Sequence, residues 1–187
     1  FYNKFPFAPL HGLLVLQPEQ QWAQYLSREM HLSVWQIAQQ LGQGMPGMGF
    51  GYNAYGAYAS VNHLHFQMYV GDQGGFPVEH PRWAHHGGDR AYPVNCQYLQ
   101  DPDQAWQIIA ALHAQNCPYN LLYRPGGVYI MSRRFQGSYT HAAWTGGFAW
   151  AELCGAVTTF NANDFDQLDD ADIEAELAKL MVAEDGS

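Results

Sequence analysis

Two histidines and a glutamine stand at alternate positions, His63, His65 and Gln67, directly after a small-residue stretch in "NAYGAYASVNHLHFQMYV" (53–70). Alternate residues of a strand lie on one face, so these three side chains are expected to share a face with Tyr69. The opposite face then carries only apolar side chains, namely Leu64, Phe66, Met68 and Val70. Cα atoms two residues apart lie about 6.6 to 6.8 Å from each other, so both imidazole rings can converge on one anion or one metal ion.

A polar row opposite an apolar row favours a functional face over satisfied core histidines, because buried polar groups are costly without partners. A metal is the first functional alternative, since His63 and His65 can supply two imidazole ligands. A mononuclear site needs further donors, and no Asp or Glu follows at strand spacing. The nearby candidates are Asp72, His80, His85 and His86, which fall in the predicted loop after the strand. The metal site is therefore left short of ligands.

Nucleophilic attack on phosphorus is the second functional alternative. A neutral imidazole attacks best when a hydrogen bond to its other nitrogen fixes the tautomer. The preceding stretch "YGAYASVN" (55–62) offers backbone N–H groups, together with the side chains of Ser60 and Asn62, that can surround phosphate oxygens. This hypothesis accounts for the whole stretch and not only for its histidines.

The elements before the motif must position it. An apolar run bounded by prolines (10–17) predicts a buried strand, and apolar residues at three- and four-residue spacing (20–43) predict an amphipathic helix. The segment 50–60 reads as a strand that feeds a tight turn, and 63–70 as a strand antiparallel to it. The segment between 73 and 100, rich in Gly, Pro and His, reads as a surface loop.

The second half begins at Asp101, where an Asp cap followed by Pro predicts a helix start. A hairpin (119–134), a further strand (152–160) and a last helix (164–181) follow. This order predicts an α+β fold with a mostly antiparallel sheet, flanking helices and a hint of two degenerate half-repeats. We expect one domain over 1–187, with a catalytic half (1–72), a loop (73–100) and a second half (101–183).

Composition narrows the function classes. The net charge of -9, with only 8 Lys and Arg, argues against nucleic acid as a partner, and much of the acidity lies between Asp164 and Asp185. Cys96, Cys117 and Cys154 form no CxxC pair, which predicts reduced thiols and no cysteine zinc site. No long apolar run or signal peptide appears, so a cytoplasmic protein without membrane contact is expected.

The stretch "GYNAYGAYASVNHLHFQMYV" (51–70) closely resembles the signature of the GDP-hexose phosphorylases, in the nucleotidyltransferase branch of the histidine-triad superfamily. That branch also contains galactose-1-phosphate uridylyltransferase and diadenosine tetraphosphate phosphorylase. The resemblance extends to "NKFPFAPLHGLLVLQ", "NCPYNLLYRPGGVYIMSRR" and "FAWAELCGAVTT". It therefore spans nearly the whole chain and implies a histidine-triad-like fold.

The resemblance implies a double displacement. His65 matches the nucleophile, which forms a covalent nucleotidyl-histidine while sugar 1-phosphate leaves, and inorganic phosphate then takes the nucleotide. His63 matches a companion histidine that helps bind structural zinc in the uridylyltransferases. The cysteine partners of that zinc are missing here, so no cofactor is predicted. Gln67 replaces the third histidine of the hydrolase branch, since a phosphate leaving group with a second pKa of about 6 needs no proton donor.

The resemblance also implies substrate contacts. Asn53, Ser60 and Asn62 match phosphate-side positions, and Glu152 matches a glutamate that contacts the hexose, with a solvated strand-end carboxylate as the alternative. The expected partners are a nucleotide sugar and phosphate, and a homodimer is left open. The family has a segment upstream of "NKFPF" that helps hold the base, and the given sequence starts after it. We therefore expect either a trimmed fragment or a base pocket built differently, and base and hexose stay open.

Three other functions remain as alternatives. They are a nucleotide sensor without turnover, a dinucleoside polyphosphate phosphorylase or hydrolase, and a metal-dependent enzyme that uses His63 and His65. Arg133 and Arg134 end the predicted hairpin, where a surface pair is the common case and phosphate contact the alternative.

Overall fold

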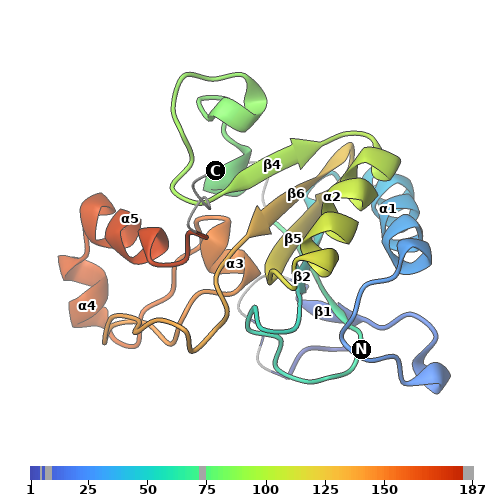
Figure 1. The fold of residues 1–187 in the computed structure, drawn as a ribbon, viewed down its shortest axis with the longest axis horizontal. Helices are drawn as coiled ribbons and strands as arrows, with labels where there is room; N and C mark the ends of the chain where they lie inside the picture. Colours follow the sequence, from blue (N-terminus) through green and yellow to red (C-terminus); the bar gives the residue numbers. More distant parts are fainter. Residues whose placement is uncertain (5, 7–9, 72–74, 183–187) are drawn as a thin grey trace.

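The structure is a computed structural model that describes residues 1–4, 6, 10–71 and 75–182. In this part of the chain a six-stranded sheet forms the centre of the molecule, and all its neighbouring strands are antiparallel (Figure 1). The strands are β1 (Gly12–Leu14), β2 (Met48–Asn53), β3 (Phe66–Val70), β4 (Cys96–Leu99), β5 (Tyr119–Arg124) and β6 (Gly127–Ser132). The predicted α+β class with an antiparallel sheet is confirmed.

The sheet consists of two halves with the same order of elements. The first half is β1, α1 (Arg28–Gly42), β2 and β3, and the second is β4, α2 (Pro102–Ala114), β5 and β6. The strands lie in the order β1-β3-β2-β5-β6-β4, so the order is mirrored across the central β2–β5 pair. This arrangement agrees with the predicted half-repeats.

The two long helices start at side-chain caps. The Ser27 side chain accepts a hydrogen bond from the Met30 amide at the start of α1. Asp101 accepts from two amides at the start of α2, with Pro102 in the first turn, as predicted. The helix predicted to begin near residue 20 begins instead at Arg28, because a short 3-10 helix (Pro18–Gln20) and an irregular segment precede the cap.

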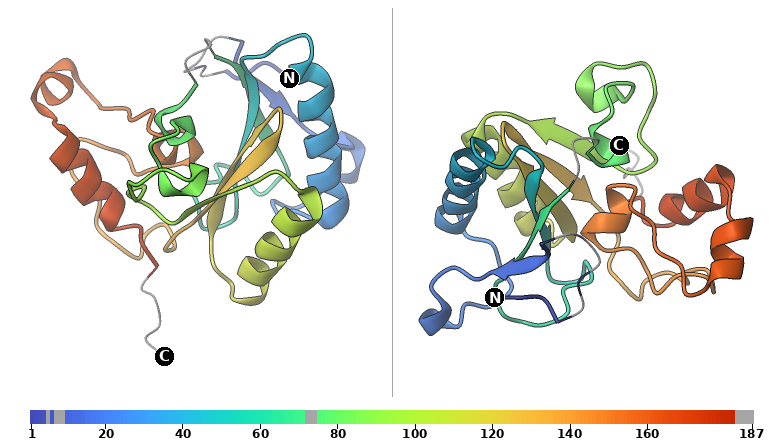
Figure 2. Two further views of the ribbon diagram at one scale, coloured as in Figure 1. Left: turned by 90° about the horizontal axis from the view of Figure 1, so that it is seen from above. Right: turned by 180° about the vertical axis from the view of Figure 1, so that it is seen from behind.

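Helices α1 and α2 cover one face of the sheet, which we call the helix face (Figure 2). Its core contains the predicted apolar row of the motif, Leu64 and Phe66 fully buried and Met68 and Val70 partly buried. The helices contribute buried apolar residues such as Val34 and Ile109. The alternation of apolar side chains in the motif is therefore confirmed.

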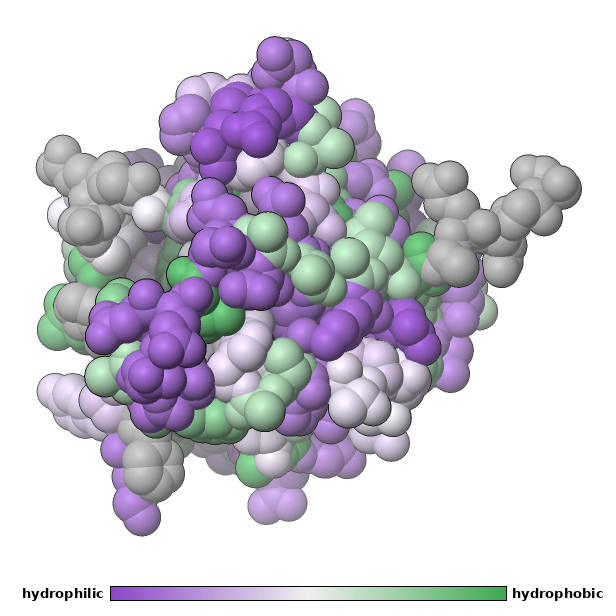
Figure 3. All heavy atoms as spheres, turned by 90° about the vertical axis from the view of Figure 1, so that its left-hand side faces the viewer, coloured by the Kyte–Doolittle hydropathy of each residue, from purple (hydrophilic) through white to green (hydrophobic). Residues whose placement is uncertain are grey.

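The opposite face of the sheet, which we call the site face, is covered by the C-terminal part of the chain (Figure 2). Its helices are α3 (Trp150–Leu153), α4 (Ala162–Gln167) and α5 (Asp170–Ala178). Trp150 and Leu153 pack here with Tyr69 of β3 and with Leu177 of α5. The outer surface on this side of the molecule is mostly hydrophilic, in keeping with its acidic sequence (Figure 3).

Four further predicted elements differ from the structure. The strand predicted over 152–160 is wrong: its first residues belong to helix α3, because the Glu152 carboxylate accepts from the Ala149 amide and so stabilises a helix start. The last helix is divided into α4 and α5, since Asp169 caps a new helix. The described part of the predicted loop contains β4 and two 3-10 helices (Pro77–Glu79 and Ala84–His86).

The fourth difference concerns the first strand, which was predicted to be buried. β1 has only three residues, lies at an edge of the sheet and is half-buried over two of them.

Within the described residues, no helix is both long enough and apolar enough to cross a membrane.

A buried histidine links the helix layer to the sheet. His31 of α1 has no exposed surface, and its Nε2 donates to the Pro102 carbonyl at 3.0 Å. Its Nδ1 lies 2.7 Å from the Tyr123 hydroxyl, which donates to it because Nε2 carries the proton. Desolvation by burial lowers the pKa of His31, against the opposing effect of the Pro102 hydrogen bond. His31 is therefore held neutral in the folded protein.

We predict that acid destabilises the fold partly through His31. The unfolded chain takes up a proton near pH 6.5, whereas the folded chain resists protonation until lower pH, so the free energy of unfolding falls as the pH drops below about 6.5. One such group contributes a slope of at most about 1.4 kcal/mol per pH unit. Denaturant unfolding between neutral and acidic pH should show a shallower slope for His31→Gln. The exposed His141→Gln is the control, and an unchanged slope in His31→Gln would contradict the prediction.

Candidate active site

His65 lies one residue before β3 and is held in a single tautomer. Its Nδ1 is 2.8 Å from the backbone carbonyl oxygen of His63, and only 7% of the residue is exposed. A carbonyl can only accept, so Nδ1 carries a proton, and in the neutral ring the lone pair is then on Nε2. This is the tautomer that an attacking imidazole requires, and the expected hydrogen bond to the second ring nitrogen is present.

Gln24 holds the backbone around His65. The Gln24 side chain is buried, its Oε1 accepts from the His65 amide at 3.1 Å, and its Nε2 donates to the Asn53 carbonyl at 2.7 Å. The backbone amide of Gln24 in turn donates to Oδ1 of Asn62 at 3.0 Å. One residue thus ties the segment before α1 to the end of β2 and to the start of β3. Sequence reasoning missed Gln24, because its partners lie far along the chain.

Gln67 lies on the site face, where Trp150 orients its amide. The indole Nε1 of Trp150 donates to Oε1 of Gln67 at 2.9 Å, and an indole N–H can only donate. The Gln67 NH₂ group is consequently directed away from Trp150 as a donor. The side chain also forms a hydrogen bond with His11, which is buried just before β1. Burial lowers the pKa of His11, and the bond to Gln67 opposes that shift.

Glycine in β2 makes room for Trp150. Gly51 pairs with Gln67 across the β2–β3 register, and the indole of Trp150 lies directly over Gly51. A Cβ added at Gly51 would be 2.1 Å from Trp150 Cδ2. The indole also stacks on Tyr69, with ring centroids 5.3 Å apart. Gly51 therefore determines how closely Trp150, the hydrogen-bond donor to Gln67, approaches the sheet.

Asn53 is at the centre of a buried hydrogen-bond network. Its Oδ1 accepts from Asn120 Nδ2 at 2.7 Å and from the Trp150 amide at 2.9 Å. Asn120 also donates to the Ala57 carbonyl at 3.0 Å. These bonds hold the turn after β2 against β5 and against the start of α3. The side-chain oxygen of Asn53 thus already accepts two hydrogen bonds from other residues of the protein.

Arg133 extends this network and corrects an expectation. Its side chain is fully buried and not part of a surface pair, whereas Arg134 is exposed. The Arg133 guanidinium donates to the Phe148 carbonyl and, at 2.6 Å, to the Tyr139 hydroxyl, and it lies 3.5 Å from Asn120 Oδ1. Desolvation lowers the pKa of Arg133, against the opposing effects of neighbouring tyrosines and of Glu152.

The remaining predicted residues lie around this centre. Ser60 and Asn62 are exposed on the turn before His65, and His63 is half-buried. Both Glu152 oxygens are engaged, one by the Ala149 amide and the other by the Thr158 hydroxyl, each at 3.0 Å. The structure thus brings His63, His65 and Gln67 to one region with Asn53 nearby, while their roles toward a substrate stay predictions.

The described residues do not fit a metal centre. They contain no group of three His, Cys, Asp or Glu side chains arranged to hold an ion. The histidines of the 73–100 segment are engaged elsewhere: His85 Nε2 lies 2.8 Å from the Val78 carbonyl, and His86 Nε2 lies 3.0 Å from the Tyr129 hydroxyl.

Comparison with solved structures places the fold in a known class. The chain superposes on yeast Ap4A phosphorylase Apa2 with a TM-score of 0.74 and 17% identity, covering 98% of this chain and 72% of that one. The same enzyme in complex with Ap4A gives a TM-score of 0.73 and 17% identity, with 97% and 73% covered. The chain thus shares the histidine-triad-like fold of this phosphorylase.

A family model makes the relationship more specific. Residues 1–69, which include the His63, His65 and Gln67 motif, match the model described as "GDPGP1-like, N-terminal domain". A comparison of the sequence with curated proteins gives no match. Residues 1–69 are thus similar to the GDPGP1-like N-terminal domain, and nearly the whole chain shares the fold of yeast Ap4A phosphorylase.

We predict that Gln24→Ala loosens the backbone at His65. The change leaves the His65 amide and the Asn53 carbonyl without their buried partner, which costs about 1 to 3 kcal/mol of unfolding free energy. Hydrogen exchange of the His65 amide should also accelerate. Gln40→Ala, at an exposed position of α1, is the matched control and should change stability by less than about 0.5 kcal/mol. Equal protection of the His65 amide in both variants would disprove the assigned role.

We predict that Gly51→Ala displaces Trp150. The added Cβ would overlap the indole, and such overpacking costs about 1 to 3 kcal/mol of unfolding free energy. The NMR resonance of the Trp150 indole N–H should shift or broaden as the bond to Gln67 is lost. Gly44→Ala, where a Cβ meets no atom within 4 Å, serves as the control. An unchanged indole resonance would show that the close approach is not required.

Proposed function

We propose that this chain transfers a nucleotidyl group from a nucleoside diphosphate hexose, GDP-hexose being favoured, to phosphate through a covalent intermediate on His65. The observation that carries the proposal is the tautomer of His65, fixed by the His63 carbonyl at 2.8 Å. It is supported by the position of this motif within the region that matches the GDPGP1-like domain. The fold shared with a yeast nucleotide phosphorylase adds further support.

The first half-reaction forms a bond between His65 and phosphorus. Nε2 of His65 attacks the α-phosphorus, and the bond from that phosphorus to the bridging oxygen of hexose 1-phosphate breaks. The leaving group keeps the electron pair and needs no proton, because its phosphate has a second pKa of about 6. The Nδ1 proton stays on the ring, where the His63 carbonyl stabilises the positive charge that develops on the imidazole.

The second half-reaction regenerates the enzyme. An oxygen of inorganic phosphate attacks the same phosphorus, the bond to Nε2 breaks, and nucleoside diphosphate leaves. No external acid or base is required in either step. The Gln67 amide, oriented by Trp150, supplies a hydrogen-bond donor for phosphate oxygens in both steps. This role suits an amide, which holds oxygens but transfers no proton.

Dinucleoside polyphosphates are the second candidate substrates. This alternative is favoured by the fold shared with yeast Ap4A phosphorylase, which has been solved in complex with Ap4A. The chemistry at His65 would be the same, with a nucleotide as the leaving group in place of hexose 1-phosphate. The two candidates therefore differ in substrate and share the covalent intermediate.

We predict that the α-phosphate of the substrate becomes attached to His65. The protein should be incubated without phosphate with GDP-, UDP- or ADP-hexose or Ap4A, each radiolabelled at the α-phosphorus, and then denatured. Acid-labile label is expected on the wild-type chain and not on His65→Ala, and added phosphate should release it as nucleoside diphosphate. Exposed His80→Ala is the control and should keep the label. If none of these substrates labels the protein, the proposed function is wrong.

A further inference from the structure

Among the described residues, the hydroxyl of Tyr52 has no partner that meets hydrogen-bond geometry, although Tyr119 lies close enough to affect its pKa. Tyr52 of β2 points to the helix face and is 1% exposed, and its oxygen is the one buried side-chain polar atom of the described residues that lacks a partner. The neighbouring Tyr119 hydroxyl is engaged by His113 at 2.7 Å. Burial raises the pKa of Tyr52, so the hydroxyl stays a neutral donor. A buried hydroxyl without a partner is costly and needs an explanation.

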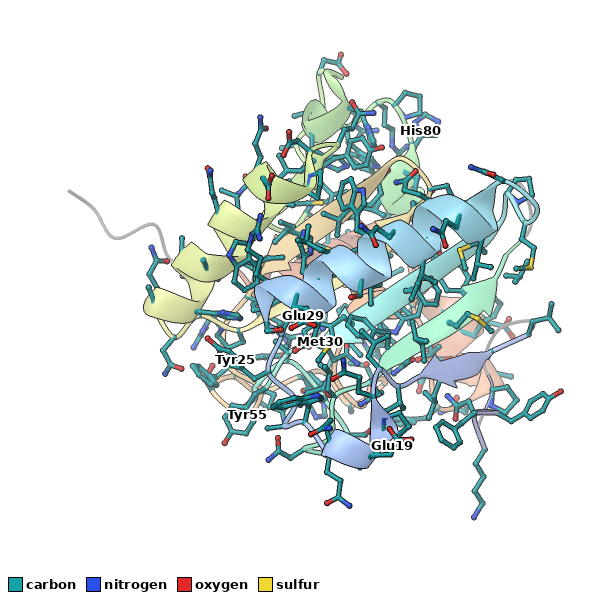
Figure 4. All side chains as sticks on the ribbon, turned by 90° about the vertical axis from the view of Figure 1, so that its right-hand side faces the viewer. Glu19, Tyr25, Glu29, Met30, Tyr55 and His80 are labelled. Carbon is teal, nitrogen blue, oxygen red and sulfur yellow. The ribbon has the colours of Figure 1, made fainter. Side chains whose placement is uncertain are left out.

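Tyr52 lines a cavity of about 110 Å³ at the C-terminal end of β2. Half of its lining residues carry aromatic rings, namely Tyr25, Tyr52, Tyr55, His113, Tyr119 and Phe135. Tyr25 stacks on His113, with centroids 4.4 Å apart, and Figure 4 shows Tyr25 and Tyr55 near the start of α1. Tyr25 and Tyr55 are 61% and 73% exposed, so aromatic surface extends from the cavity to solvent.

The chemistry of the lining selects the ligand. None of the described residues that line this cavity is Asp, Glu, Lys or Arg, and burial lowers the pKa of His113, which favours its neutral form. Such walls disfavour ions and favour flat ring systems. The volume far exceeds that of one water and approaches that of a cavity which binds benzene. Tyr25 also lines a second cavity of about 380 Å³, which offers room for a substituent of the ring.

We propose that this aromatic cavity binds an uncharged planar heterocycle of the nucleobase kind. The Tyr52 hydroxyl donates a hydrogen bond to a ring nitrogen or carbonyl oxygen of the ligand. The cavity lies on the helix face, whereas Gln67 and Trp150 lie on the site face. The binding claim is therefore independent of the covalent chemistry proposed for His65.

Gln24 lies between this cavity and the backbone of His65. Gln24 lines the cavity, and its side chain holds the His65 amide and the Asn53 carbonyl. Ala54 and Tyr55, from the turn directly after Asn53, line it as well. A bound ring thus rests against the groups that set the backbone of the nucleophile.

The test uses nucleosides, which carry the base without phosphate. Calorimetric titration of the full chain with adenosine, guanosine, cytidine and uridine should detect binding of at least one. Tyr52→Phe removes only the oxygen without a partner and should weaken that binding about three- to tenfold, the usual effect of one hydrogen bond. Tyr55→Ala should weaken it as well, and Tyr2→Ala, 97% exposed at the edge of the sheet, should not.

Two outcomes would overturn the proposal. One is absence of binding by all four nucleosides at millimolar concentration, which would leave only trapped water to satisfy Tyr52. The other is equal affinity of wild type and Tyr52→Phe, which would place the ligand elsewhere. Covalent labelling of His65 and nucleoside titration are separate measurements, so failure of the proposed function and failure of this cavity are distinguishable. Tyr52→Phe should remain folded, because it removes a buried polar atom that forms no bond.

Discussion

The hydrogen bond from His65 Nδ1 to the His63 carbonyl is the interaction on which the candidate site depends, because it alone determines which ring nitrogen can attack. The bond is local, yet its geometry is imposed from a distance. The Leu64 amide donates to the Trp22 carbonyl at 2.8 Å, and the His65 amide donates to Gln24. Residues 22–24 thus hold the backbone before β3 in a conformation that lets the His63 carbonyl reach the imidazole ring.

The two faces of β2 serve different purposes. Phe50 and Tyr52 are large and fill the core on the helix face, whereas Gly49 and Gly51 leave the site face bare. A bare backbone lets an indole lie flat on the sheet, and the indole then directs the Gln67 amide. The glycines of this strand therefore contribute to the site by leaving space for neighbouring rings. A search of the sequence for chemically reactive side chains does not identify such residues.

The sequence predicted the features that depend on neighbours in the chain. Period-two alternation placed Phe66 and Gln67 on opposite faces, and Asp101 was identified as a helix cap, because strand geometry and capping act over a few residues. The same local rule explains one error, since the capping carboxylate of Glu152 makes a helix where apolar composition suggested a strand. Gln24 and Trp150 were not found, because hydrogen bonds to partners 41 and 83 residues away leave no periodic pattern.

The motif lies in the first half of the chain, but its support comes from the second. Asn53 needs Asn120 as donor, and Gln67 needs the indole of Trp150, so both depend on residues outside the 1–69 region. Without β5, strand β2 would be left as an open edge with unpaired backbone groups, and Asn53 Oδ1 would lose its hydrogen bond from Asn120. The mirrored halves are therefore not interchangeable: one carries the proposed nucleophile, and the other supplies the hydrogen bonds that hold its surroundings in place.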